Sequence, residues 1–419
     1  MCPAGFSPIT VQNSSSPLFS NRPDHMACQS QSQSVQQVCL PPGQGTAFTP
    51  SGMTGQKNAN RRRTLMFEGQ WTLWDELEYQ GAKPTGSDNQ GLWEDPFADV
   101  TRTRDRGTSF TSATGTIGGQ TVSGHTTDVG GGGGAYYTKS FNPSAYQTIS
   151  VGGLFRYDSL RTTFDVDPLA GAFGNSGSAN RDVYTTAAFF RYRVRDTYFA
   201  GGIAGSWGHG DWTDNVTPAT GSYSSHGFMS GVSLGHVFTL FDALAVSRPS
   251  RITKGPLPAT WANGYVVKLD VSGNVGYWRD RIGGFVDSSG FAWGDEQIRS
   301  WRAGGQAMLL ANVYRGGYQM TPFVAATVTS DFSFSHTLDI PVQVGQIADT
   351  IFYGSPQTFW GVRAGYDVVA PGGWNFGLEG FTQNSSQYQV LGARAYVRTP
   401  IFDWLGFNGP SPIPTSRPR

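Results

Sequence analysis

The strongest constraint in this sequence is the alternation of side chains across residues 265–277. One parity reads Tyr265, Val267, Leu269, Val271, Gly273, Val275 and Tyr277, and the other reads Val266, Lys268, Asp270, Ser272, Asn274 and Gly276. Six of the seven residues in the first set are apolar, against one of six in the second. A repeat of two places the sets on opposite faces of an extended strand, so the segment predicts a strand with one dry face and one wet face.

The length of this segment favours a membrane strand. Soluble strands usually have about 5–6 residues, whereas a tilted strand needs about 9–11 residues to cross a bilayer. Similar alternation recurs from Thr148 onward, and strands are expected near residues 148–157, 185–194, 228–238, 303–313, 360–368 and 374–379, with less regular ones near 196–209, 318–333 and 388–399. Together they predict roughly twelve strands, an even number of the kind found in bacterial barrels.

Composition supports the same interpretation. Charged residues make up 14% of the 419 residues, below the roughly 25% of an average soluble domain, whereas aromatic residues reach 13% and glycine occurs 56 times. No segment approaches the roughly 18 consecutive apolar residues of a transmembrane helix. Lys+Arg and Asp+Glu both total 30, so no net field favours nucleic acid. These values predict an all-β fold, an antiparallel transmembrane β-barrel. A soluble β-sandwich that binds a partner is the alternative from another class, since aromatic residues also pack sandwich cores.

The chain divides into three regions. Residues 1–66 are rich in Ser, Gln and Pro and hold all three cysteines, and they predict a disordered or partly helical segment that is a candidate lumen plug. Residues 67–402 are the expected barrel, with a first strand near Trp71, and residues 403–419 form a Pro-rich tail. The glycines at 130–134 are expected to form a flexible run rather than a phosphate-binding loop, because no strand–turn–helix context surrounds them.

The connections predict which membrane is crossed. Tight turns at residues 193–196 and 315–317 alternate with long connections at 208–221, 241–261, 279–299 and 333–350. Short periplasmic turns with long external loops are typical of outer-membrane barrels. Such a protein must be exported, yet residues 1–6 have neither a basic nor an apolar signal region. We therefore expect an incorrect start codon or a fragment.

Charged side chains recur on the polar parity and are expected to line the lumen, because Arg or Lys on the lipid face costs about 2–4 kcal/mol at the midplane. They are Arg156, Arg191, Arg193, Lys268, Asp270, Arg302, Arg363, Asp367, Glu379 and Arg394. Ion pairs that fill the pore and ion selection both fit this pattern. Tryptophans near strand ends are expected to form a membrane aromatic girdle, comprising Trp207, Trp278, Trp301, Trp360 and Trp374.

No catalytic grouping emerges from the sequence. The six histidines are scattered without the spacing of metal ligands, and no Gly-x-Ser-x-Gly pattern occurs in a strand–helix setting. We therefore expect no enzyme activity, no metal and no cofactor.

Several segments resemble the autotransporter β-barrel (translocator) domain of Gram-negative outer membranes. The resemblance covers residues 67–402 and is carried by WTLW at 71–74, LGHVF at 234–238, QMTPFV at 319–324, GVRAGY at 361–366 and LGARAYV at 391–397. It implies a twelve-stranded barrel that supports passage or display of an N-terminal segment, with residues 1–66 as residual passenger or linker.

The resemblance also implies partners. These are outer-membrane lipid and the barrel-insertion machinery, with the protein monomeric and no nucleic acid involved. Phe402 would be the terminal assembly signal, although seventeen residues follow it. The alternative within the same compartment is a porin- or adhesin-like barrel that acts through its lumen or its long loops.

Overall fold

The computed structural model describes the chain in fifteen ranges that include every long strand. They are residues 7–12, 27–29, 35–40, 89–94, 97–112, 120–144, 146–166, 175–215, 219–243, 245–246, 262–288, 292–340, 349–354, 356–370 and 374–400. The predicted strand near Trp71, the proposed plug in residues 1–66 and the predicted signal at Phe402 lie wholly or largely outside these ranges. Among the described residues no helix is long and apolar enough to cross a membrane.

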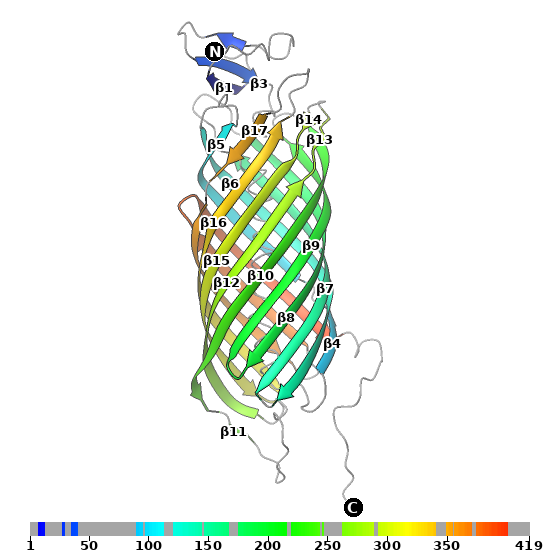
Figure 1. Cartoon of the computed structure of the whole chain (residues 1–419), viewed down its shortest axis with the longest axis vertical. Helices are drawn as coiled ribbons and strands as arrows, with labels where there is room; N and C mark the ends of the chain where they lie inside the picture. Colours follow the sequence, from blue (N-terminus) through cyan, green and yellow to red (C-terminus); the bar gives the residue numbers. More distant parts are fainter. Residues whose placement is uncertain are drawn as a thin grey trace, which may run out of the picture.

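Within the described ranges, twelve long strands form one closed antiparallel barrel (Figure 1). They are β5 (Phe97–Ser112), β6 (Gln120–Ser144), β7 (Gln147–Val166), β8 (Asn175–Val194), β9 (Thr197–Asp214), β10 (Thr220–Asp242), β12 (Ala262–Ile282), β15 (Glu296–Arg315), β16 (Tyr318–Ile340), β18 (Thr358–Val369), β19 (Asn375–Asn384) and β20 (Tyr388–Pro400). Each pairs with the next, and β20 closes the barrel on β5 from Tyr388↔Asp105 to Tyr396↔Phe97. The predicted all-β barrel of about twelve strands is confirmed, and the sandwich alternative is wrong.

Shorter strands extend or accompany this barrel. β4 (Asn89–Glu94) continues the line of β5, because it pairs with β6 on one side and with Thr399 and Pro400 of β20 on the other. The remaining short strands are β11 (Ala245–Val246), β13 (Phe285–Val286), β14 (Ala292–Trp293) and β17 (Asp349–Tyr353). A separate three-stranded sheet comprises β1 (Ser7–Gln12), β2 (Ala27–Gln29) and β3 (Val35–Leu40).

The two ends of the barrel differ in their connections. At the lower end in Figure 1, hereafter the turn end, strands are joined through residues 145–146, 195–196, 316–317, 243–261 and 370–374. At the opposite, loop end, the connections are 113–119, 167–174, 215–219, 283–295, 341–357 and 385–387. The turn at Gly316 and Gly317 has φ of 59° and 82°, as a two-residue hairpin turn of type I′ requires.

Two expectations about connections are corrected. Most of residues 208–221 belong to β9 and β10, so the connection there is short. The long connection at 243–261 lies at the turn end, not among the long loops of the opposite end.

The glycines at 130–134 are also not a flexible run: they lie inside β6 and pair with residues 156–160 of β7. At Gly134 an added Cβ would lie 2.5 Å from the Phe155 carbonyl oxygen, so a glycine is needed for this close approach.

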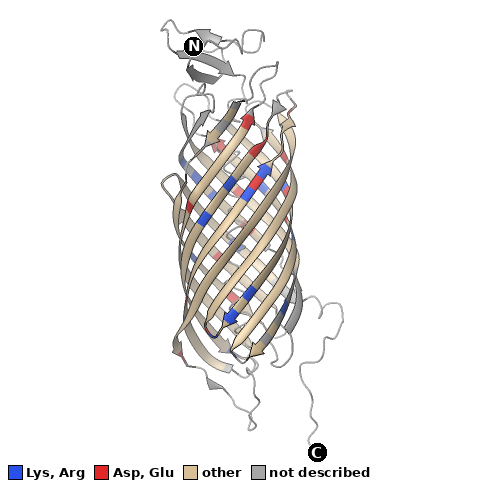
Figure 2. Cartoon of the chain, in the orientation of Figure 1, with Lys and Arg blue, Asp and Glu red and all other residues tan. Residues whose placement is uncertain are grey.

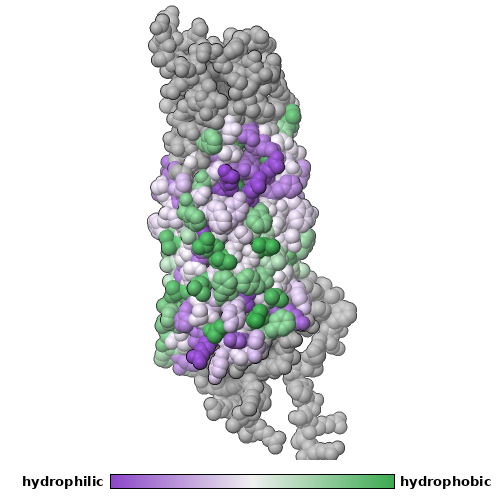
Figure 3. Space-filling view, in the orientation of Figure 1, coloured by the Kyte–Doolittle hydropathy of each residue, from purple (hydrophilic) through white to green (hydrophobic). Residues whose placement is uncertain are grey.

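The faces of the strands separate as the alternation predicts. In β12 the side chains of Val266, Lys268 and Asp270 are buried inside, whereas Tyr265, Val271 and Val275 are exposed outside. The apolar outer band covers the part of the barrel nearer the turn end, and the wall above it is hydrophilic (Figure 3). The strands therefore continue past the band toward the loop end with polar residues on both faces.

Candidate functional site

The lumen gathers most of the charged side chains predicted for it. Nine of the ten are buried on the inner face of their strands: Arg156, Arg191, Arg193, Lys268, Asp270, Arg302, Arg363, Asp367 and Arg394. Glu379 is half-buried and shares the inner parity of β19 with Asn375 and Gly377. Figure 2 marks the charged positions along the strands. The lumen is consequently the polar core of this molecule.

One ion-pair cluster lies toward the loop end. Arg302 Nε donates to Asp331 Oδ1 at 2.6 Å, and Ser300 Oγ donates to the same oxygen at 2.9 Å. The Arg302 guanidinium also lies 5.1 Å from the centre of the Trp278 ring. A bulge in β16, opposite Trp301 and Arg302, shifts the register by one residue. Asp331 before the bulge and His336 after it therefore both point inward, although they are five residues apart. Breaking such a buried pair costs about 3–5 kcal/mol.

Two further pairs extend this cluster around the wall. Arg181 Nη2 donates to Ser225 Oγ at 2.8 Å and lies 3.6 Å from Asp280 Oδ2. His336 Nε2 lies 2.7 Å from Glu296 Oε1. Among the residues of these ion pairs, the alternation predicted only Arg302 as lumen-lining. The others lie where the outer face is also polar, so polar and apolar residues do not alternate there.

Two tyrosine bridges stabilise the lumen toward the turn end. Tyr198 of β9 reaches across Gly235 of β10 and donates to both Asp270 oxygens of β12, at 3.1 and 3.2 Å. Tyr396 of β20 likewise reaches across Gly377 of β19 and donates to Asp367 of β18. Added Cβ atoms at Gly235 and Gly377 would lie 2.3 and 2.0 Å from these rings. Each bridge therefore needs the glycine on its middle strand.

An arginine completes each tyrosine bridge. The Arg191 guanidinium lies 5.3 Å from the centre of the Tyr198 ring, and that of Arg394 lies 5.2 Å from Tyr396. Arg363 makes a similar contact with Phe323 at 5.7 Å. Cation–π contacts of this kind contribute about 0.5–2 kcal/mol, more when water is excluded. The alternation predicted the charges but not the tyrosine rings, since the aspartates that the two tyrosines reach lie two strands away.

The sequence did not predict an apolar patch on the inner wall. Met308, Leu310, Phe323 and Ala325 form a buried cluster on β15 and β16. Met308 and Leu310 have the same parity as Arg302, so the alternation of β15 does place them inside. The signal is weak there because apolar residues on both faces of this part of β15 blur the pattern.

The predicted girdle is partly corrected. Trp207, Trp301, Trp360 and Trp374 are exposed on the outer face, whereas Trp278 is 2% exposed and lies inside against Arg302. Trp278 shares the parity of Lys268 and Asp270, so its position in β12 required an inward side chain. Outer rings in contact mark the upper border of the apolar band: Tyr184 with Trp207, Phe228 with Tyr277, Tyr277 with Trp301, and Trp301 with Phe332.

Residues 283–288, which follow β12, pack against the inner wall at the loop end. Phe285 contacts the rings of Trp212 and Tyr223 and covers Gly221, and the Ser288 N–H donates to the Thr220 carbonyl at 2.8 Å. Asp295 accepts hydrogen bonds from Arg281 and from the Gly284 N–H. These contacts, that of Arg281 first, lower the pKa of Asp295 below its ordinary value, because both stabilise the carboxylate.

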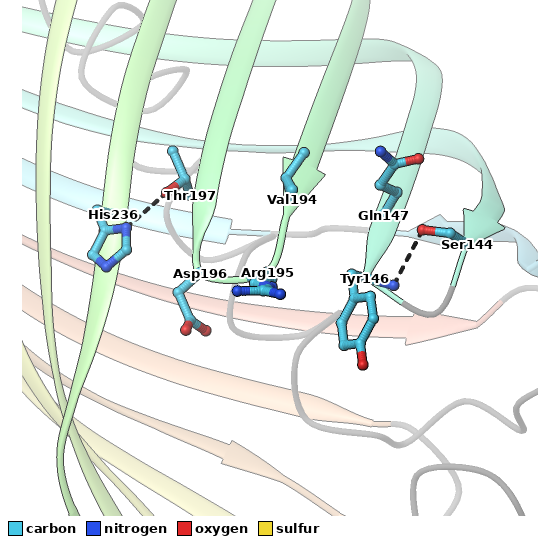
Figure 4. A pocket seen from close by; sticks show the side chains of 8 residues that line it. All are labelled: Ser144, Tyr146, Gln147, Val194, Arg195, Asp196, Thr197 and His236. Carbon is cyan, nitrogen blue, oxygen red and sulfur yellow. Dashed lines mark hydrogen bonds between the residues drawn. The ribbon is translucent and has the colours of Figure 1, made fainter.

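A cavity of about 660 Å³ lies among the hairpins of the turn end (Figure 4). Arg195, with φ of 54°, lies over the Tyr146 ring at 5.1 Å, and Thr197 Oγ1 is 2.7 Å from His236 Nδ1. Arg193 Nε donates to the Arg195 carbonyl at 2.5 Å. Asp196 lines the same cavity as this hydroxyl–imidazole pair. Within the described ranges no group of three His, Cys, Asp or Glu side chains could hold a metal ion.

Comparison with known proteins identifies a fold. No family model matches the chain, and no curated protein matches it. The transport unit of the autotransporter AIDA-I from Escherichia coli has a TM-score of 0.51 at 9% identity, covering 77% of this chain and 97% of that one. The translocator domain of NalP from Neisseria meningitidis has a TM-score of 0.49 at 14% identity, covering 82% and 97%. The toluene transporter TodX of P. putida is more distant, with a TM-score of 0.33 at 9% identity and coverage of 74% and 90%.

The likeness extends to the architecture already described. The transport unit from Escherichia coli is matched over nearly its whole length by a closed barrel of twelve antiparallel strands. The fold of this chain is therefore that of an autotransporter translocator barrel.

Proposed function

We propose that this barrel is an outer-membrane translocator that carries or displays the segment preceding Asn89. The supporting observation is where the barrel begins and ends. Asn89 of β4 pairs with Ser140 of β6, and Pro400 of β20 pairs with Trp93, so both ends of the barrel's chain lie at the turn end. The preceding segment thus leaves the wall at the rim of a lumen lined with polar groups, a path to the loop end.

The proposal includes the surroundings of the barrel. Outer-membrane lipid contacts the apolar band, the barrel-insertion machinery assembles it, and the protein works as a monomer without an enzymatic step. Exposed apolar residues all around the band support the lipid contact, because such a surface is unfavourable in water.

Epitope accessibility on intact cells tests the direction of display. The chain is exported with a heterologous secretory signal and carries a tag at its N-terminus, between Gly316 and Gly317, or within residues 341–348. We expect antibody to reach the N-terminal tag and the 341–348 tag, and to reach the 316–317 tag after permeabilisation alone.

The same three tags separate the competing function. A porin- or adhesin-like barrel keeps its N-terminal tag protected while the 341–348 tag is accessible. That outcome would overturn the translocator proposal and leave the outer-membrane barrel intact.

A further inference from the structure

We propose that the outer wall of β12 and β15 binds the phosphate groups of a phosphorylated saccharolipid of the lipid A type. The site comprises Arg279 and Arg299, hereafter the arginine pair, with Arg281 beside them. The inference rests on the fold as an outer-membrane barrel and not on the translocation of any segment.

The arginine pair is held together by the sheet. Arg279 and Arg299 are directly opposite in the β12–β15 register, and both side chains are exposed on the outer face. Side chains opposite each other have Cβ atoms about 4.5–5.5 Å apart, and like charges in that position destabilise a sheet. A bound anion would remove this repulsion.

The described residues around the pair do not neutralise it. Arg281 forms an ion pair with Asp295. Arg279 is next to the neutral side-chain amide of Gln297, and with that amide flipped its oxygen accepts a hydrogen bond from Arg279 Nε at 3.2 Å. Asp280 and Glu296 are buried on the inner face, away from the pair. Within the described part of the chain, Arg299 has no hydrogen-bond or ion-pair partner, and Ser335 lies opposite it on β16. The pair is thus an exposed double positive charge.

The height of the pair on the wall identifies the anion. Immediately below it, Tyr277 and Trp301 are in contact, with ring centres 5.0 Å apart, at the upper border of the apolar band. Aromatic rings of this kind favour the lipid headgroup level. Blue positions on β12 and β15 in Figure 2 and the purple area in Figure 3 lie at the loop-end side of that border.

The ligand chemistry follows from this position. Three of the five turn-end connections have two residues, with 243–261 the long exception, whereas every loop-end connection is longer than two. Longer connections are typical of the external side, so the headgroups at this level belong to the outer leaflet. The phosphates of lipid A are the anionic groups of that leaflet, and paired guanidinium groups bind phosphate oxygens through charge-assisted, bidentate hydrogen bonds.

Binding of bisphosphorylated lipid A to the folded full chain in detergent tests the inference. The variant Arg279→Gln with Arg299→Gln is compared with Arg104→Gln with Arg161→Gln, which removes two exposed arginines on the outer faces of β5 and β7 that face no arginine across the sheet. We expect the first variant to bind about tenfold more weakly and the control to stay within about twofold. Heat-modifiable gel migration confirms that each variant is folded, and Arg279→Lys with Arg299→Lys should bind with intermediate strength.

Further ligands distinguish the source of the phosphate. Dephosphorylated lipid A and phosphatidylglycerol should each bind the wild type only as weakly as bisphosphorylated lipid A binds the Arg279→Gln, Arg299→Gln variant. Inorganic phosphate at the same concentration as lipid A should not displace lipid A from the wild type. Equal weakening by the control pair, equal binding of the dephosphorylated lipid, or equal binding of phosphatidylglycerol would each overturn the assignment.

Discussion

The tyrosine bridges show how single glycines set the inner wall. Tyr198 lies across Gly235, where an added Cβ would be 2.3 Å from the ring. We expect Gly235→Ala to displace the ring and break its hydrogen bonds to Asp270, which lowers the free energy of unfolding by about 1–3 kcal/mol. Urea unfolding of the barrel in lipid vesicles, followed by tryptophan fluorescence, measures the change.

Gly205 provides the matched control for this substitution. It lies on the outer face of β9, and an added Cβ there meets nothing within 4 Å. Gly205→Ala should therefore be neutral or should stabilise by about 0.4–1 kcal/mol, because alanine reduces the freedom of the unfolded chain. Equal losses at both glycines would mean that the bridge contributes nothing specific.

At the scale of the strand, the sequence predicts the faces best where the outer face is apolar and the inner face is polar. In β12 the outer residues 265–277 are apolar and the inner ones polar, so inward Lys268 and Asp270 follow directly from parity. The strands beyond the band have water outside and polar groups inside, so residues near 208–221 show no alternation and their sequence predicts a loop. The glycines of β6 have no side chains, so they show no alternation. Each tyrosine bridge joins a tyrosine, a glycine and an aspartate from three different strands, and a pattern along one strand cannot predict such a contact.

The face assignment of β12 predicts the cost of a charge on each side. Thirteen residues from Tyr265 to Tyr277 rise about 41 Å along the strand, or about 29 Å along the axis at a tilt of ~45°, which matches a bilayer core. Val271 lies at the middle of this span and is exposed outside. We expect Val271→Arg to lower the free energy of unfolding in vesicles by about 2–4 kcal/mol, since the charge must enter hydrocarbon.

The inward control lies three residues farther along the same strand. Asn274 is opposite Ser233 and Gly304, two small residues, so an arginine there has room in the polar lumen. Asn274→Arg should cost less than about 1 kcal/mol. If the inner variant were destabilised as much as the outer one, lipid could not be the cause of the alternation.

At the scale of the whole molecule, the barrel has two zones with different surroundings. The zone near the turn end is apolar outside, and its lumen holds the tyrosine bridges and the apolar patch; the zone near the loop end is polar outside, and its lumen holds the Arg302–Asp331 pair. Phe285, which follows β12, packs on the inner wall of the second zone. The wall therefore lines a path that is longer than the membrane is thick.

Single-channel conductance tests whether the N-terminal segment occupies that path. We expect the full chain in planar bilayers to conduct weakly, and deletion of residues 1–66 to raise the conductance several-fold, because a segment in the lumen excludes ions. Deletion of residues 403–419 is the control and should leave the conductance unchanged, since that tail follows the last strand. Unchanged conductance after the first deletion would contradict a plug, and a large conductance of the full chain would favour the porin-like alternative.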